Sequence, residues 1–148
     1  MKLKPEEAEA VAFMQWARTC LPRGISCVLV HIPLERRSSR LNRMFFGRIG
    51  VRSGVSDYLL ACPAHGYHGL FIELKRADKR AKPSAAQLDW LLDVGRMGFA
   101  GGVARGGAAA AGLVFDYLTG VFPVEEGEII VEARQTYPPS LGSWSLTV

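Results

Sequence analysis

The stretch GVSDYLLACPAHGYHGLFIELK, residues 54–75, contains two short apolar runs separated by a segment rich in turn-forming residues. We expect strands at 57–62 and 69–74, joined as a hairpin by PAHGYH. Alternate residues of a strand share a face, so Glu73 and Lys75 project together and the leucine between them points the other way. A carboxylate and an ammonium group therefore stand side by side at the end of a core strand.

The rest of the chain alternates between helical and strand patterns. Apolar periodicity and turn residues predict helices at 5–18, 38–46, 84–97 and 108–118, with Ser84 as a helix cap, and strands at 25–32 and 99–103. EIIVEA, from Glu128, is one more strand candidate. This order predicts a small α/β domain with a mixed sheet. Its core spans about residues 5–118, and the sequence assigns no role to the extension at 119–148.

Length and composition favour a single domain without a membrane span. A chain of 148 residues is long enough to bury one core. Its three cysteines are odd in number and too few for a disulfide framework, which is typical of a reduced cytoplasmic protein. No segment approaches the roughly 18 consecutive apolar residues of a membrane span. We therefore expect a soluble cytoplasmic protein with no membrane partner.

Positive charge gathers on both sides of the quoted stretch. Residues 36–52 hold six arginines and no acid, and residues 75–82 hold five bases against Asp78, in a chain whose net charge is +4. Basic segments interleaved with aromatic residues are typical of proteins that bind a polyanion such as DNA, although a solvated charged face is the alternative. The candidate phosphate contacts are Arg36, Arg37, Arg40, Lys79, Arg80 and Lys82.

The charged residues of the hairpin predict phosphate chemistry. If the two strands pair, Asp57 arrives near Glu73, and two adjacent carboxylates favour a hard cation such as Mg²⁺. Lys75 beside that metal would orient a water and stabilise charge developing on phosphorus. Gln87, on the following helix, would reach back to the lysine or to a phosphate. The alternative is a pair of surface carboxylates with a neighbouring lysine and a solvated glutamine.

These residues resemble a known family. GVSDYLL, GLFIELK and the downstream Gln87, with Leu88, Leu91, Leu92 and Gly95, are similar to the virus-type replication-repair nuclease (VRR-NUC) domain of the PD-(D/E)xK nuclease superfamily. The resemblance runs from about Glu6 to Leu118 and implies a restriction-endonuclease-like mixed β-sheet flanked by helices. The chain departs from the family pattern at Ser56, where proline is usual, and at Arg36-Arg37, where a loop containing asparagine often follows the first strand.

The resemblance also implies roles for individual residues. Asp57 and Glu73 would ligate Mg²⁺ or Mn²⁺, Lys75 would serve the attacking water, and Gln87 would support the site. An acid of the first helix would join the metal, with Glu6 as the first candidate and Glu9 as the second.

The implied activity is a metal-dependent DNA endonuclease of bacterial or phage origin. Stand-alone members of the family act as homodimers on branched DNA such as four-way Holliday junctions. Two alternatives stay open: a restriction-like endonuclease that cuts duplex DNA, and a non-catalytic nucleic-acid-binding module.

Other motifs favour structural roles. Cys62, His65 and His68 offer three metal ligands at most, so a hairpin turn is favoured over a zinc site. His31 would lie near the site or at the edge of the core. GGVARGG, residues 101–107, lacks the P-loop pattern, so these glycines are assigned to a link between strand and helix.

Overall fold

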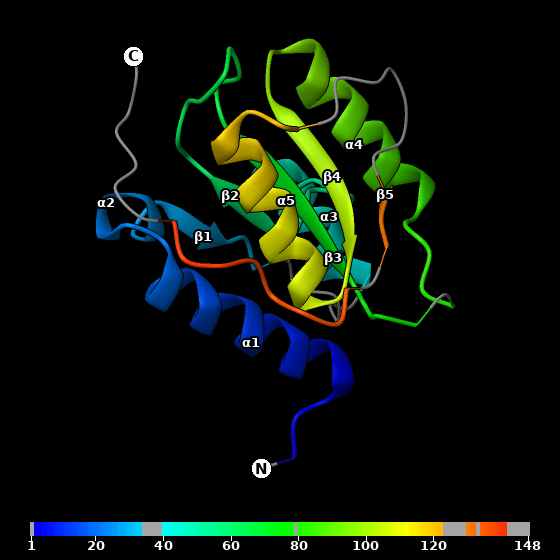
Figure 1. Ribbon diagram of the computed structural model, residues 1–148. Coiled ribbons are helices and arrows are strands. Elements are labelled where there is room, and N and C mark those ends of the chain that lie inside the picture. Colours follow the sequence, from blue (N-terminus) through cyan, green and yellow to red (C-terminus); the bar gives the residue numbers. More distant parts are fainter. Residues whose placement is uncertain (1, 34–39, 79, 123–129, 133, 142–148) are drawn as a thin grey trace.

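A computed structural model describes residues 2–33, 40–78, 80–122, 130–132 and 134–141, and Figure 1 shows the arrangement of their helices and strands. The helices are α1 (Pro5–Cys20), α2 (Arg23–Ser26), α3 (Arg40–Arg48), α4 (Ala85–Arg96) and α5 (Gly107–Thr119). The strands are β1 (Leu29–His31), β2 (Tyr58–Leu60), β3 (Leu70–Lys75), β4 (Ala100–Arg105) and β5 (Ile130–Val131). No helix among these residues has the length and apolar character that a membrane span requires.

The strands form one mixed sheet in the order β1-β2-β3-β4-β5. β1, β2 and β3 pair antiparallel, whereas β4 is parallel to both β3 and β5. The antiparallel pair β2–β3 is the predicted hairpin, and α4 is the crossover that a parallel β3–β4 pair requires. The expectation of a mixed α/β sheet flanked by helices is confirmed.

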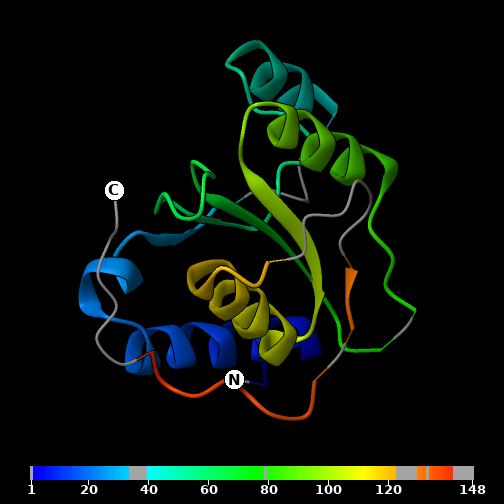
Figure 2. The ribbon, with the colours of Figure 1, turned by 45° about the horizontal axis from the view of Figure 1, so that its top comes forward.

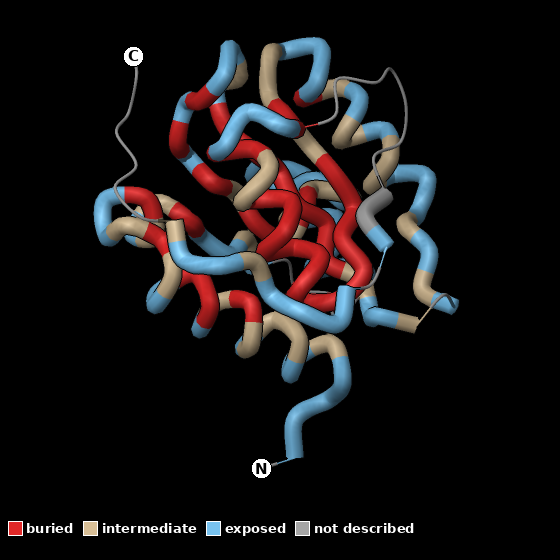
Figure 3. Tube along the Cα trace, viewed as in Figure 1, coloured by how far each residue is buried: buried red, intermediate tan, exposed pale blue. Residues whose placement is uncertain are grey.

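Helices cover both faces of the sheet. α1 and α5 lie on one face, and α4 lies on the other with α3 beside it (Figure 2). The buried residues concentrate in α5 and in the central strands, as Figure 3 shows. Because α5 is packed among α1, β3 and β4, its sequence is apolar almost all round, as a buried helix requires.

The central strand β3 divides its side chains between these two faces. Leu70, Ile72 and Leu74 belong to the core shared with α1 and α5. Phe71 points the other way, and its ring centroid lies 5.4 Å from that of Trp90 on α4. The strand period therefore places Glu73 and Lys75 on the same face as Phe71, as predicted, and the structure shows that α4 covers this face.

The start of the first strand differs from the prediction. Residues 25–32 were expected to be extended, but Arg23–Ser26 form the helical turn α2 and only Leu29–His31 form β1. The backbone N–H groups of Ile25 and Ser26 both donate to the carbonyl of Pro22 at 2.9 Å, which closes this turn. Ile25 is buried from a helical turn, so its apolar character did not distinguish helix from strand.

Gly54 docks the chain onto α4 shortly before β2 begins. Its φ of +86° lies in the left-handed region, which only glycine adopts freely. A Cβ at this position would collide with the backbone carbonyl of Ala86, in the first turn of α4. The approach to β2 is therefore held close to the N-terminus of α4.

The segment 134–141 belongs to the packed domain. The Trp16 indole Nε1 donates to the carbonyl of Pro138 at 2.9 Å, and the N–H of Leu141 donates to the carbonyl of Cys20 at 3.0 Å. Leu141 also packs against the core. Part of the extension to which the sequence assigned no role thus runs alongside α1 (Figure 1).

Candidate active site

Asp57 meets the end of β3. Tyr58 pairs with Ile72 in the antiparallel β2–β3 ladder, so continuing that register by one residue brings Asp57 opposite Glu73. The Asp57 Oδ2 atom accepts a hydrogen bond from the N–H of Leu74 at 2.9 Å. The predicted approach of the two acids therefore follows from the strand register, and a backbone hydrogen bond fixes the Asp57 carboxylate.

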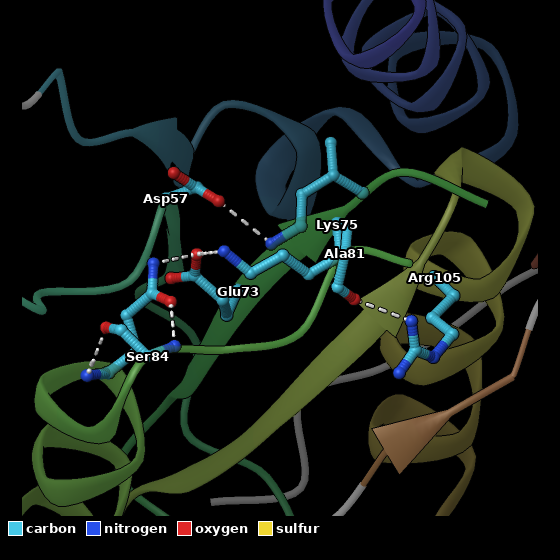
Figure 4. Close-up of polar contacts among 8 residues, drawn as sticks. Asp57, Glu73, Lys75, Ala81, Ser84 and Arg105 are labelled. Carbon is cyan, nitrogen blue, oxygen red and sulfur yellow. Dashed lines mark hydrogen bonds and ion pairs between the residues drawn. The ribbon is translucent and has the colours of Figure 1, made fainter. Parts of the chain in front are cut away.

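Glu73 is a fully buried acid. Its Oε1 atom lies 3.0 Å from the Lys75 ammonium, whose side chain is only 12% exposed. The Gln87 Nε2 atom donates to the same oxygen. A buried carboxylate is stable only when charges and hydrogen bonds replace its lost water, and these two side chains supply them. Figure 4 shows Asp57, Glu73 and Lys75 gathered near the N-terminus of α4.

Helix capping orients Gln87. The N–H of Ser84 donates to Gln87 Oε1 at 2.8 Å, and the N–H of Gln87 donates to Ser84 Oγ at 3.2 Å, which together form a capping box. With its oxygen so engaged, the amide turns its nitrogen toward Glu73. The predicted helix cap is confirmed, and the glutamine contacts the acid rather than the lysine.

Gln87→Ala should reduce activity without removing any charge. The Glu73 carboxylate loses a donor that orients it, and losses of such supporting contacts typically cost about 10–100-fold in activity or metal affinity. Ser84→Ala is the matched control, because it weakens the cap by about 1 kcal/mol and leaves the amide in place. Cleavage rates and melting temperatures of both variants separate the two effects, and equal losses of rate would contradict a role specific to Gln87.

A cavity of about 810 Å³ opens at Asp57. Its walls come from α1, over most of the length of that helix, from the end of β1 and from the strand ends at Tyr58 and Leu74. Both His31 and Glu6 line it. The pKa of Tyr58 is raised, first by burial and then by the nearby charge of Asp57. Asp57 thus lines the open cavity and also lies opposite the buried Glu73 in the register of β2 and β3.

The two acids proposed for the first helix have different surroundings. Glu6 lines the cavity with Asp57, whereas the Glu9 Oε2 atom accepts the N–H of Gly107 at 2.7 Å, at the start of α5. In the described parts of the chain, no three acidic, histidine or cysteine side chains cluster closely enough to hold a metal ion. The structure brings Asp57 and Glu73 together in adjacent strands, whereas Glu6 lies on the α1 wall of the cavity. A metal-binding role for Glu6 stays a prediction.

The predicted DNA contacts are placed in part. Arg40, Arg80 and Lys82 are exposed, and Arg36, Arg37 and Lys79 lie outside the described residues.

The loop after β3 is held by a residue that the sequence analysis did not select. Arg105, buried at the end of β4 beside Lys75, donates from Nη1 to the carbonyl of Ala81 at 2.7 Å. The sequence did offer one signal for this role, because Arg105 is a basic residue at the end of a strand whose other residues are small or apolar.

The region with zinc-like spacing is a turn, as expected. Ala64 and Tyr67 form an isolated antiparallel bridge. The His65 Nε2 atom lies 3.0 Å from the carbonyl of Leu118, so this histidine ties the turn to the end of α5.

The mixed sheet and its flanking helices define a restriction-endonuclease-like fold. A solved structure named "VRR_NUC domain protein" superposes with a TM-score of 0.68 over 80% of this chain and 92% of that chain, at 23% sequence identity. No model of a known protein family matches the sequence, and no curated protein matches it. The likeness confirms the fold that the sequence resemblance implied.

Proposed function

We propose that this chain is a metal-dependent nuclease that hydrolyses phosphodiester bonds in DNA, with branched DNA as its substrate. The observation that carries the proposal is the buried Glu73–Lys75 pair, set opposite Asp57 where the β2–β3 ladder ends. The shared fold with a VRR_NUC domain protein supports it.

The chemistry of the carboxylates fits a hard divalent cation. Asp57 and Glu73 carry two negative charges against the single ammonium of Lys75, so the group retains net negative charge and oxygen ligands, which Mg²⁺ and Mn²⁺ favour. These two residues would hold the metal. Glu6, predicted from the sequence as a third ligand, lines the adjoining cavity with Asp57 but does not cluster with the two acids among the described residues, so it would have to approach them to reach the ion. When bound, the ion would polarise a phosphoryl oxygen and lower the pKa of a coordinated water.

The remaining side chains orient the reacting groups. The Lys75 ammonium is largely withdrawn from solvent, so its charge acts more strongly on a nearby phosphate or water than an exposed charge would. It would hold the attacking water and stabilise charge that develops on the phosphoryl oxygens. Gln87 holds the Glu73 carboxylate in place through its amide nitrogen. The chain thus supplies positioning and electrostatic stabilisation.

A four-way junction calls for two symmetric cuts, which a two-fold homodimer would make naturally. The decisive experiment is cleavage of labelled four-way junction, flap, fork and linear duplex DNA, with Mg²⁺, Mn²⁺ or a chelator. Metal-dependent cutting of the branched substrates is the expected result. Preferential cutting of linear duplex would instead favour a restriction-like enzyme, and binding without any cutting would favour a non-catalytic module.

Salt should weaken DNA binding steeply. Each phosphate contact lowers log K by about 0.9 per unit of log[salt] on B-form DNA, because binding releases counterions. In a binding-competent Asp57→Asn background, Arg80→Ala and Lys82→Ala should each reduce the slope by about one contact. Arg23→Ala, which removes an exposed base from α2, is the control. Fluorescence anisotropy across a salt series measures these slopes, and unchanged slopes would assign the two bases to a solvated face.

A further inference from the structure

α3 turns its apolar stripe toward solvent. Leu41, Met44, Phe45 and Ile49 recur at the spacing of one helix face, with Ile49 just beyond the helix end. Their exposed fractions are 77%, 63%, 58% and 60%. An amphipathic helix ordinarily packs this face on a core, and a contiguous apolar surface of this kind marks a binding site.

The stripe flanks the helix that supports the candidate active site. Beyond α3, the Arg52 Nη2 atom lies 3.0 Å from Asp93 Oδ2, and its guanidinium carbon lies 5.5 Å from the Trp90 ring centroid. These contacts join the segment that follows α3 to α4, the helix that carries Gln87. Figure 2 shows α3 on the α4 side of the sheet, away from α1 and α5.

The positive charge of α3 favours a polyanion as the ligand that covers its apolar stripe. Arg40, Arg43 and Arg48 are all exposed, and the helix contains no acid. Arg48 falls on the stripe itself, seven residues after Leu41. A two-fold contact between copies of this helix would bring like-charged arginines together, which is unfavourable. A polyanion would be attracted by the same charges, but it must also offer apolar surface to the stripe.

Unpaired bases meet both requirements. In a paired duplex the base faces are hidden in the stack, whereas an unpaired base presents a flat apolar face to an aromatic side chain. We propose that the exposed stripe of α3 binds unpaired bases of DNA at a gap or branch point, with Phe45 stacking on a base and Arg40 and Arg48 contacting flanking phosphates. This inference rests on the proposed function, because it identifies the DNA feature that marks the substrate.

The test measures binding apart from cleavage. Full-length Asp57→Asn protein, in chelator, is titrated into a labelled duplex that carries a short single-stranded oligothymidine gap and into the same duplex fully paired. Phe45→Ala should lower affinity for the gapped DNA about tenfold, the loss of one stacked base, and change affinity for the paired duplex by less than about twofold. Phe45→Tyr, which keeps a ring, should restore gap binding. Val121→Ala, at a 65% exposed apolar residue after α5, is the matched control.

A base analogue gives a direct readout. The fluorescence of 2-aminopurine placed in the gap should change on binding to the parent protein or to its Phe45→Tyr variant, and stay near that of free DNA with Phe45→Ala. Equal affinity losses on both DNAs, or no loss on either, would overturn the proposal. Sedimentation that shows Phe45→Ala splitting a dimer into monomers would also overturn it, because the stripe would then be an interface between copies. If no DNA is cleaved yet gap binding depends on Phe45, the nuclease proposal fails and the docking surface stands.

Discussion

Glu73→Gln is expected to abolish metal-dependent DNA cleavage, lowering the rate by about 1000-fold or more. The substitution removes one of the two carboxylates proposed to hold the cation, and several kcal/mol of charge stabilisation at the phosphate go with it. Asp57→Asn should act in the same way, because it removes the other ligand charge. Its amide oxygen can still accept the N–H of Leu74, so the backbone contact that fixes residue 57 is retained.

Stability must be measured alongside rate, because Glu73→Gln leaves Lys75 without its partner. Breaking a buried ion pair on one side costs about 3–5 kcal/mol, and the slight exposure of the ammonium reduces this figure. Assays are therefore run well below the melting temperature of each variant, established by circular dichroism. Asp89→Asn, at an exposed acid of α4, is the charge-matched control. Full activity in either the residue 57 or the residue 73 variant would refute the site assignment.

Lys75→Ala should separate metal binding from turnover. The ammonium acts on water and phosphate, so its loss should lower the rate by about 100–1000-fold, as removal of a preorganised donor does. Metal affinity should persist or rise, because a positive charge 3.0 Å from Glu73 Oε1 competes with a cation for that oxygen. Isothermal titration calorimetry with Mn²⁺ measures the affinity, and cleavage of a labelled junction measures the rate.

Lys82→Ala is the matched control for this prediction, since it removes an exposed lysine from the loop after β3. It should weaken DNA binding most at low salt, where a phosphate contact contributes most to affinity, and leave the rate at saturating DNA unchanged. Loss of both metal binding and turnover in Lys75→Ala would contradict the division of labour between the lysine and the two acids.

The sequence predicted the parts of the site that depend on local periodicity. Strand alternation placed Glu73 and Lys75 on one face of β3, and the Ser84 cap predicted where α4 begins. The hairpin predicted that Asp57 would approach Glu73, and the register of β2 and β3 does place these two residues opposite each other. Each of these relations joins residues that are close along the chain or in adjacent strands.

Relations set by tertiary contact were not predictable in this way. Gln87 turns to Glu73 because the capping box engages its oxygen, which a sequence does not display. The hydrogen bond from Arg105 to the carbonyl of Ala81 joins a strand end to a loop that is distant in the sequence. The stripe of α3 has the pattern of a buried face, and only its surroundings show that Phe45 is exposed.

The contacts of the segment 134–141 determine where the chain can be truncated without destabilising the domain. A chain shortened to about residues 5–118 would match the core expected from the sequence, yet it would lose the partners of Trp16 and Cys20 along α1. The same helix carries Glu6 and one wall of the cavity. We therefore expect the shortest chain that folds stably to extend through Leu141. A purification tag should be tolerated when it is added after Leu141, but not when it replaces the segment 134–141.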